Sequence, residues 1–130
     1  MFKRIDHVTI TADDLPAAAQ VWEATLGLIG DAPHPAAGAR LACLPVGDAY
    51  LELAQPEGEG PYGDWLRQQA EGMCLVGIEV DDLGAAVAHL RARGAQVSEP
   101  QEGAVPGVSF ALVDTASTHG VPIALIQRSE

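Results

Sequence analysis

The sequence lacks the features that direct a chain to a membrane, to nucleic acid or to an oxidising compartment. No run approaches the roughly 18 apolar residues of a membrane-spanning helix. The N-terminus turns polar within a few residues, unlike a signal peptide. The chain has two cysteines, Cys43 and Cys74, which are too few for a disulfide framework. This cysteine content is typical of proteins in a reducing compartment. Lys and Arg number 7 against 18 Asp and Glu, and this net charge of −11 argues against nucleic acid and anionic membranes as partners. We therefore expect a cytoplasmic protein.

The composition is typical of one folded domain. Apolar residues make up 48% of the 130-residue chain, which is enough for a hydrophobic core. The length suits one ordinary domain rather than two. We therefore expect residues 1–130 to form a single domain.

The chain contains two copies of one pattern, 68 residues apart. Residues 7–15 align without a gap with residues 75–83, and apolar residues alternate in both stretches as in a strand. An Asp-Asp pair follows in each copy and supplies a helix cap. Five pairs of positions are identical: Val8 and Val76, Ile10 and Ile78, Asp13 and Asp81, Asp14 and Asp82, Leu15 and Leu83. The repeat predicts two similar modules.

Each predicted helix is followed by further strands. The helices are expected to end near Gly27 and Gly94, because glycine readily adopts the left-handed conformation of a helix end. Residues 56–72 are rich in Pro and Gly and predict a linker with a short helix at 64–69. The predicted strands are 4–11, a poorly marked one near 29–35, 39–46 and 49–55 in the first copy, and 75–80, 95–98, 107–113 and 121–127 in the second. Two βαβββ modules, 1–55 and 73–130, therefore predict an α+β fold.

The last strands of the two copies also align, at an offset of 72 residues. Glu52 is thus equivalent to Ala124, just as His7 is equivalent to Leu75. Alternation along the strand places Glu52 on the face opposite its leucine neighbours. A buried carboxylate needs a partner, and His7 is the obvious one. We therefore predict a hydrogen-bonded pair of His7 and Glu52 that acts as a catalytic base dyad.

Five short stretches, taken in order and spacing, resemble signature stretches of the vicinal oxygen chelate superfamily, and within it of the methylmalonyl-CoA epimerases. This superfamily includes glyoxalase I, extradiol dioxygenases and the fosfomycin and bleomycin resistance proteins. The stretches are Ile5-Asp6-His7, Leu26-Gly27-Leu28, Leu44-Pro45-Val46-Gly47, Glu79-Val80-Asp81-Asp82 and Ser117-Thr118-His119-Gly120-Val121. The resemblance covers essentially the whole chain. It implies a curved mixed sheet of paired modules around a cavity, and a homodimer.

The resemblance also implies a divalent metal held by one residue from the first and last strand of each module. The corresponding positions here are His7, Glu52, Leu75 and Ala124, so two side chains can bind a metal and two cannot. The loop at 36–39 lacks the acid that an epimerase carries there. We therefore expect no tightly bound cofactor, with a weakly held divalent metal at His7 and Glu52 left open.

Other residues have competing interpretations. His7 is either functional or a buried polar residue of the core. His119 is either a surface turn residue or a substrate contact, and Leu75 and Ala124 are expected to line the substrate site. Cys74 is expected to face away from that site, because a strand neighbour points to the opposite side. The linker residues Tyr62 and Trp65 either cap the cavity or cover an edge.

The sequence therefore favours a protein that binds a small molecule, with an incomplete metal site. Its predicted activity is a metal-independent isomerase, lyase or cyclase step that uses His7 and Glu52. The alternative is a metal-dependent epimerase similar to methylmalonyl-CoA epimerase. A scaffold without a small ligand is disfavoured, because Glu52 is expected to face inward.

Overall fold

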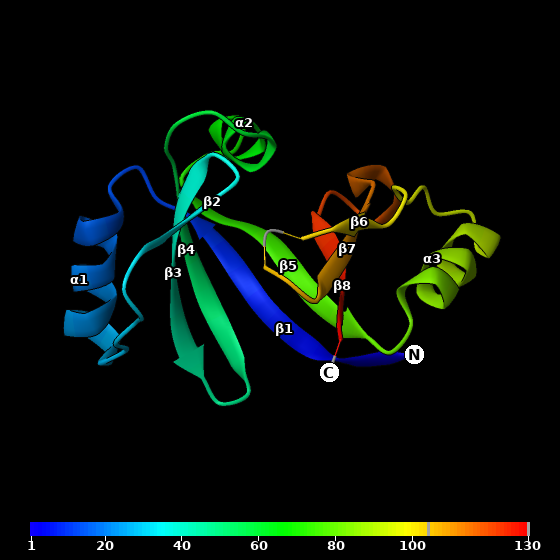
Figure 1. Ribbon diagram of the computed structural model, residues 1–130, viewed down its shortest axis with the longest axis horizontal. Helices are drawn as coiled ribbons and strands as arrows, with labels where there is room; N and C mark the ends of the chain where they lie inside the picture. The colour runs from blue at the N-terminus through cyan, green and yellow to red at the C-terminus, as the bar shows by residue number, and fades with distance from the viewer. Residues whose placement is uncertain (104, 130) are drawn as a thin grey trace. The chain divides into compact units, whose positions relative to one another are not determined.

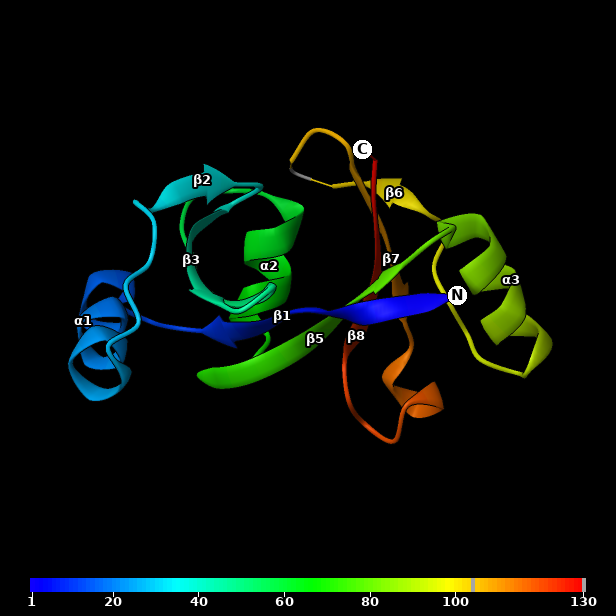
Figure 2. The ribbon, with the colours of Figure 1, turned by 90° about the horizontal axis from the view of Figure 1, so that it is seen from below.

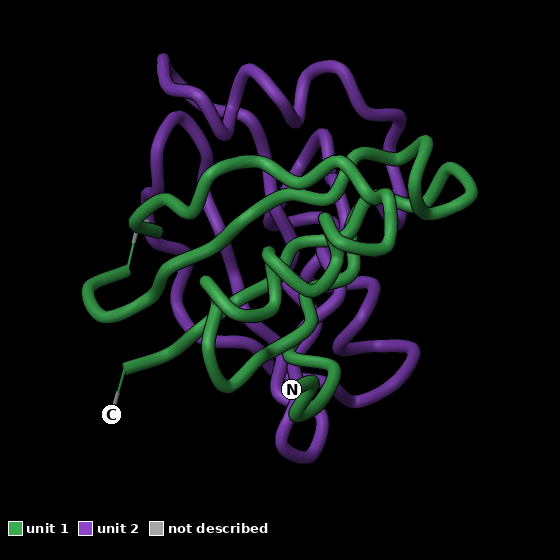
Figure 3. Tube along the Cα trace, turned by 90° about the vertical axis from the view of Figure 1, so that its right-hand side faces the viewer, with its two compact units in different colours: residues 1–6, 75–130 green, residues 7–74 purple. Residues whose placement is uncertain are grey.

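The computed structural model describes residues 1–103 and 105–129, and these form two compact units. Unit 2 comprises residues 7–74, and unit 1 comprises residues 1–6 and 75–130 (Figure 3). The boundaries fall between Asp6 and His7 and between Cys74 and Leu75. These two boundaries lie 68 residues apart, which is the offset of the sequence repeat. The division into units therefore follows the internal repeat.

The helices and strands follow the predicted order in both copies (Figure 1). The elements are β1 (Phe2–Thr11), α1 (Leu15–Leu26), β2 (His34–Ala36), β3 (Ala39–Val46), β4 (Ala49–Pro56), α2 (Pro61–Arg67), β5 (Gly72–Val80), α3 (Leu83–Ala92), β6 (Gln101–Glu102), β7 (Val108–Val113), the short 3-10 helix η1 (Thr115–Ser117) and β8 (Ile123–Arg128). Within the described residues, none of the helices is both long and apolar enough to cross a membrane.

In unit 2, strand β4 lies between β1 and β3. It pairs in parallel with β1 and antiparallel with β3, and β3 continues to β2. Helix α1 packs on one face of these strands, over a buried core of Leu15, Ala42, Leu44 and Leu53. Trp22 packs against this core. Figure 2 shows α1 and α2 on opposite sides of β3, so the face that α1 leaves free is the one near α2.

Unit 1 repeats this arrangement. Strand β8 lies between β5, its parallel neighbour, and β7, which is antiparallel and continues to β6. Helix α3 covers one face, over a core of Val80, Leu83, Ala86, Val87, Val97, Ala111, Val113 and Leu125. The α+β class with mixed strand pairing is confirmed, as is the βαβββ order of each copy.

The helix ends confirm the predicted caps. The side chain of Asp14 accepts a hydrogen bond from the Ala17 amide at 3.1 Å, and Asp82 accepts one from Ala85 at 3.0 Å. Helix α1 ends at Gly27, which has a φ of 72°. A second shared contact was not predicted. Gln55 and Gln127 each accept a hydrogen bond, of 2.6 Å, from the first amide of the helix in their own unit.

Several elements have bounds other than those predicted, and three of these differences have a clear origin. The weak first-copy strand shrinks to the three residues of β2. The strand expected at 95–98 is reduced to a single bridge between Val97 and Val113, and pairing resumes at β6 after Pro100, which has no amide to donate. Helix α2 begins at Pro61, earlier than predicted, because proline suits the first turn of a helix.

Candidate functional site

The candidate site is the face of unit 2 opposite α1. Ile10, Leu51 and Leu53 pack toward α1, so their strand neighbours point to the other face. The parallel register sets His7 beside Tyr50 and Thr9 beside Glu52. These side chains therefore form a polar row on a surface whose reverse side is the hydrophobic core.

Glu52 lies at the centre of this row with its carboxylate buried. The residue is 8% exposed. Its Oε1 atom accepts a hydrogen bond from the hydroxyl of Tyr62 at 2.6 Å and one from the hydroxyl of Thr9 at 3.3 Å. A buried carboxylate is stable only when donors replace its lost hydration. Tyr62 is the stronger of these two donors by distance.

Tyr62 reaches Glu52 from helix α2, in the segment predicted as a linker. Burial, the negative charge of Glu52 and the hydrogen bond to Glu52 together raise the pKa of Tyr62 far above its ordinary value of 10.0. The phenol therefore stays protonated and acts as a donor. The sequence left its role open, because no pattern marked which linker residue would reach the strands.

His7 is 7% exposed and stacks on the ring of Tyr50. The ring centroids lie 5.0 Å apart and the planes are inclined by 13°. The hydroxyl groups that donate to Glu52 belong to Tyr62 and Thr9. The predicted hydrogen bond between His7 and Glu52 stays a prediction. Both members of the predicted pair nevertheless lie on the same face of neighbouring strands.

The expected orientation of Cys74 was wrong. Its thiol is buried, accepts a hydrogen bond from Thr11 at 3.1 Å and contacts the carbonyl of Thr9 at 3.5 Å. Burial raises the pKa of Cys74, and the charge of Glu52 raises it further, while the hydrogen bond from Thr11 acts in the opposite direction. The Cys74 thiol therefore lies beside Thr9 and Thr11, on the strand β1 that also carries His7.

The other predicted site residues lie in unit 1. Leu75 is half-buried on β5, and Ala124 is buried on β8 as the register partner of Gly77. His119 is exposed in the turn after η1 and has a φ of 57°. A role in substrate binding remains a prediction for all three residues.

Sequence reasoning missed an ion-pair cluster in unit 1. Asp6 is fully buried and accepts hydrogen bonds from Arg128 at 2.8 and 3.1 Å and from Arg4 at 3.1 Å. Glu79 is bonded to Arg4 at 2.8 Å and lies 3.6 Å from the amine of Lys3. Each of these carboxylates is thus neutralised by a cation. The charged residues were visible in the sequence, but their pairing joins positions far apart in the chain.

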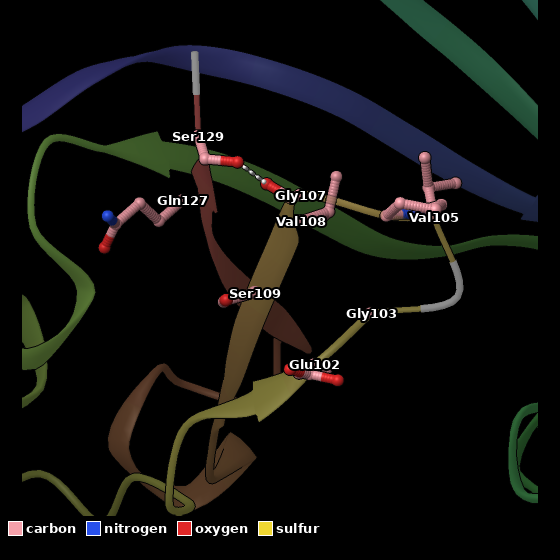
Figure 4. Close-up of a pocket in the computed structure, with 9 residues that line it drawn as sticks. Glu102, Gly103, Val105, Gly107, Val108, Ser109, Gln127 and Ser129 are labelled. Atoms are coloured by element: carbon pink, nitrogen blue, oxygen red, sulfur yellow. Dashed lines mark hydrogen bonds between the residues drawn. The ribbon is translucent and has the colours of Figure 1, made fainter.

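Each unit also has a groove. In unit 1 a groove of about 340 Å³ is lined by the β6–β7 turn and the end of β8, where the Ser129 hydroxyl donates to the Gly107 carbonyl (Figure 4). In unit 2 an apolar groove of about 260 Å³ runs between α1 and β3. Neither groove is lined by His7 or Glu52. The polar row is therefore distinct from both grooves.

The residues do not fit the four-ligand metal site that the family resemblance implies. Leu75 and Ala124 have hydrocarbon side chains that cannot coordinate a cation. Among residues 1–103 and 105–129, no group of three or more His, Cys, Asp or Glu is arranged to hold a metal ion. The hydroxyl groups of Tyr62 and Thr9 approach Glu52 instead.

Comparison with known proteins is consistent with this architecture. Residues 6–112 match the family model of the Glyoxalase/Bleomycin resistance protein/Dioxygenase superfamily. The chain is 36% identical over 111 residues to an ethylmalonyl-CoA/methylmalonyl-CoA epimerase of Cereibacter sphaeroides, which covers 80% of the chain and 83% of that protein. It is 35% identical over 68% of its length to the human mitochondrial methylmalonyl-CoA epimerase, of which it spans 52%. A solved methylmalonyl-CoA epimerase in complex with methylmalonyl-CoA and ammonium is 28% identical, with a TM-score of 0.82 over 99% of this chain and 96% of that one.

Proposed function

Because the chain belongs to the glyoxalase/bleomycin resistance protein/dioxygenase superfamily, we propose that it is an epimerase of a short-chain acyl-CoA of the methylmalonyl-CoA type. The observation that carries the proposal is the 36% identity to an ethylmalonyl-CoA/methylmalonyl-CoA epimerase over 80% of the chain. This comparison favours the epimerase alternative over the broader group of isomerase, lyase and cyclase reactions.

The proposed reaction needs a group that removes the proton from the α-carbon of the thioester. Glu52 suits this role, because its carboxylate is held by neutral donors rather than neutralised by a cation. The proton moves to Glu52 while the electron pair moves toward the thioester oxygen. Epimerisation then requires a proton donor on the other face of the carbon, and His7 is the candidate for it. The steps are assigned to side chains, since the residues do not fit a four-ligand metal.

Deuterium incorporation tests this function directly. The wild-type protein is expected to exchange the α-proton of methylmalonyl-CoA with deuterated water, as followed by NMR or mass spectrometry. Glu52→Gln and His7→Ala are each expected to lower the exchange rate by about a hundredfold or more, as the loss of a general acid or base does. Asp64→Asn, on the exposed side of α2, is the matched control and should retain the wild-type rate. Absence of exchange by the wild-type protein would contradict the proposal.

A second candidate is a protein that binds an acyl-CoA without turnover. Leu75 and Ala124 favour it, because they replace two of the four residues on which the chemistry implied by the family resemblance depends. Calorimetric titration with methylmalonyl-CoA separates the two candidates, since binding without deuterium exchange supports the second. The homodimer implied by the resemblance is likewise a proposal, and sedimentation measurements test it.

A further inference from the structure

We propose that Tyr62 is a positioning residue that holds the Glu52 carboxylate for reaction with the substrate. This inference rests on the proposed function and adds a residue to its machinery. Tyr62 fixes one carboxylate oxygen, Oε1, and thereby presents the other oxygen, Oε2, to the α-proton. In this way a phenol orients the side chain at a position where the residues of the chain do not support a bound metal.

The first support is that two hydroxyl groups converge on one oxygen. Tyr62 and Thr9 both donate to Oε1 of Glu52, at 2.6 and 3.3 Å. Thr9 comes from β1 and Tyr62 from α2, so the carboxylate is held from two different elements. Two donors on the same oxygen limit rotation of the carboxylate about its last bond. The geometry therefore distinguishes the two oxygens of Glu52.

The second support is that the backbone around Tyr62 is itself fixed. The amides of Tyr62 and Gly63 both donate to the carbonyl of Ala37, each at 3.1 Å. Helix α2 approaches this turn so closely that a Cβ atom on Gly63 would lie 2.0 Å from the carbonyl oxygen of Gly38. Only glycine permits such an approach. The start of α2 is thus docked directly on the β2–β3 turn, which fixes the point from which the Tyr62 side chain extends.

The turn that docks α2 is the loop at 36–39, in which the resemblance implied an acid. Ala37 stands just before Gly38 there and has a φ of 48°, a conformation that its carbonyl contacts with α2 help to hold. The loop therefore supports a helix that brings a phenol to Glu52. The loop that lacks the expected acid is therefore the same loop that fixes the start of the helix carrying Tyr62.

The ring of Tyr62 is restrained from a further side. It stacks on Trp65, with ring centroids 6.2 Å apart and planes inclined by 16°. Leu66, the next residue of α2, is fully buried and anchors the helix in unit 2. Ring packing and backbone docking together limit the positions that the hydroxyl can take. A single rigid donor is what a positioning role requires.

The kinetic test is Tyr62→Phe, which removes one oxygen and keeps the ring. We expect kcat for α-proton exchange on methylmalonyl-CoA to fall roughly tenfold to a hundredfold, as expected for a hydrogen bond to a charged group, while KM changes less than about twofold. Asp64→Asn on the same helix is the control and should change neither constant. Wild-type kcat in Tyr62→Phe, or a loss confined to KM, would overturn the inference.

A second measurement is independent of activity. Urea unfolding of Tyr62→Phe, Glu52→Ala and the double variant is expected to give stability losses that are less than additive, because each single change removes one partner of the same hydrogen bond. Additive losses would show that the bond does not form in solution, and would overturn the inference even for an active enzyme. If wild-type protein shows no exchange, the proposed function fails, and the double-mutant cycle alone decides whether Tyr62 holds Glu52.

Discussion

The two units share their framework and differ in their polar interiors. In both, an aspartate caps the helix, at Asp14 or Asp82, and a glutamine of the last strand, Gln55 or Gln127, accepts from its first amide. These contacts recur at equivalent positions because each copy must attach one helix to one set of strands. The framework therefore shows what the repeated fold requires.

The polar interiors show what each copy does differently. In unit 1, the buried carboxylates Asp6 and Glu79 are bonded to Arg4, Arg128 and Lys3. In unit 2, Glu52 is bonded to the hydroxyls of Tyr62 and Thr9. The unit 1 carboxylates are thus paired with cations, whereas the contacts of Glu52 come from neutral hydroxyl groups. The contrast favours a structural role for the unit 1 cluster and supports the role proposed for Glu52 in unit 2.

The largest expected effect comes from breaking the ion cluster of unit 1. Asp6→Asn removes the charge that Arg4 and Arg128 share, and we expect it to lower the free energy of unfolding by about 3 kcal/mol, as for other broken buried ion pairs. Cys74→Ala at the equivalent position of unit 2 is the control and should cost about 1 kcal/mol. Urea denaturation at neutral pH measures both. A smaller loss for Asp6→Asn than for Cys74→Ala would contradict the structural role of the cluster.

Two helical glycines, one in each unit, sharpen the comparison further. Gly63→Ala forces a Cβ atom to within 2.0 Å of the Gly38 carbonyl oxygen. The resulting shift should cost about 2 kcal/mol, as overpacking does. Gly84→Ala on α3 meets only the Asp82 carboxylate, at 3.5 Å. It should raise stability by about 0.7 kcal/mol, because alanine favours helix. Thermal and urea unfolding measure the stability of both variants. Equal changes in the two would contradict the close docking of α2 on the β2–β3 turn.

Local patterns explain why so much of the framework could be predicted. A helix cap, an alternating strand and a glycine at a helix end each depend on residues that are near in sequence. The strand at Ala39–Val46 and the caps at Asp14 and Asp82 were accordingly predicted correctly. The bounds of α2 were less accurate, because the helix is short and its start depends on Pro61.

The candidate site was less predictable because its contacts are not local. The donor Tyr62 reaches Glu52 from the segment between the copies, whereas the predicted bond between Glu52 and His7 stays a prediction. The position of Tyr62 depends on the contact between Gly63 and Gly38, which no periodicity reveals. Cys74 was misplaced for a related reason, since its contacts with Thr9 and Thr11 join residues 65 and 63 positions apart in the chain.

The smallest expected effect is on the pH dependence of the free energy of unfolding. It concerns Cys74, which occupies in unit 2 the position that Asp6 occupies in unit 1. Burial raises the pKa of the Cys74 thiol above its ordinary value of 9.0, so the folded protein keeps this proton at a pH where the unfolded chain loses it. The resulting stabilisation is complete below the unfolded pKa and is lost as the pH rises toward the folded one. We expect wild-type stability to decline more steeply than that of Cys74→Ala between about pH 8 and about pH 10. Urea unfolding across this range measures the difference between the two proteins. Parallel curves for wild type and Cys74→Ala would show that the thiol does not titrate differently in the folded protein.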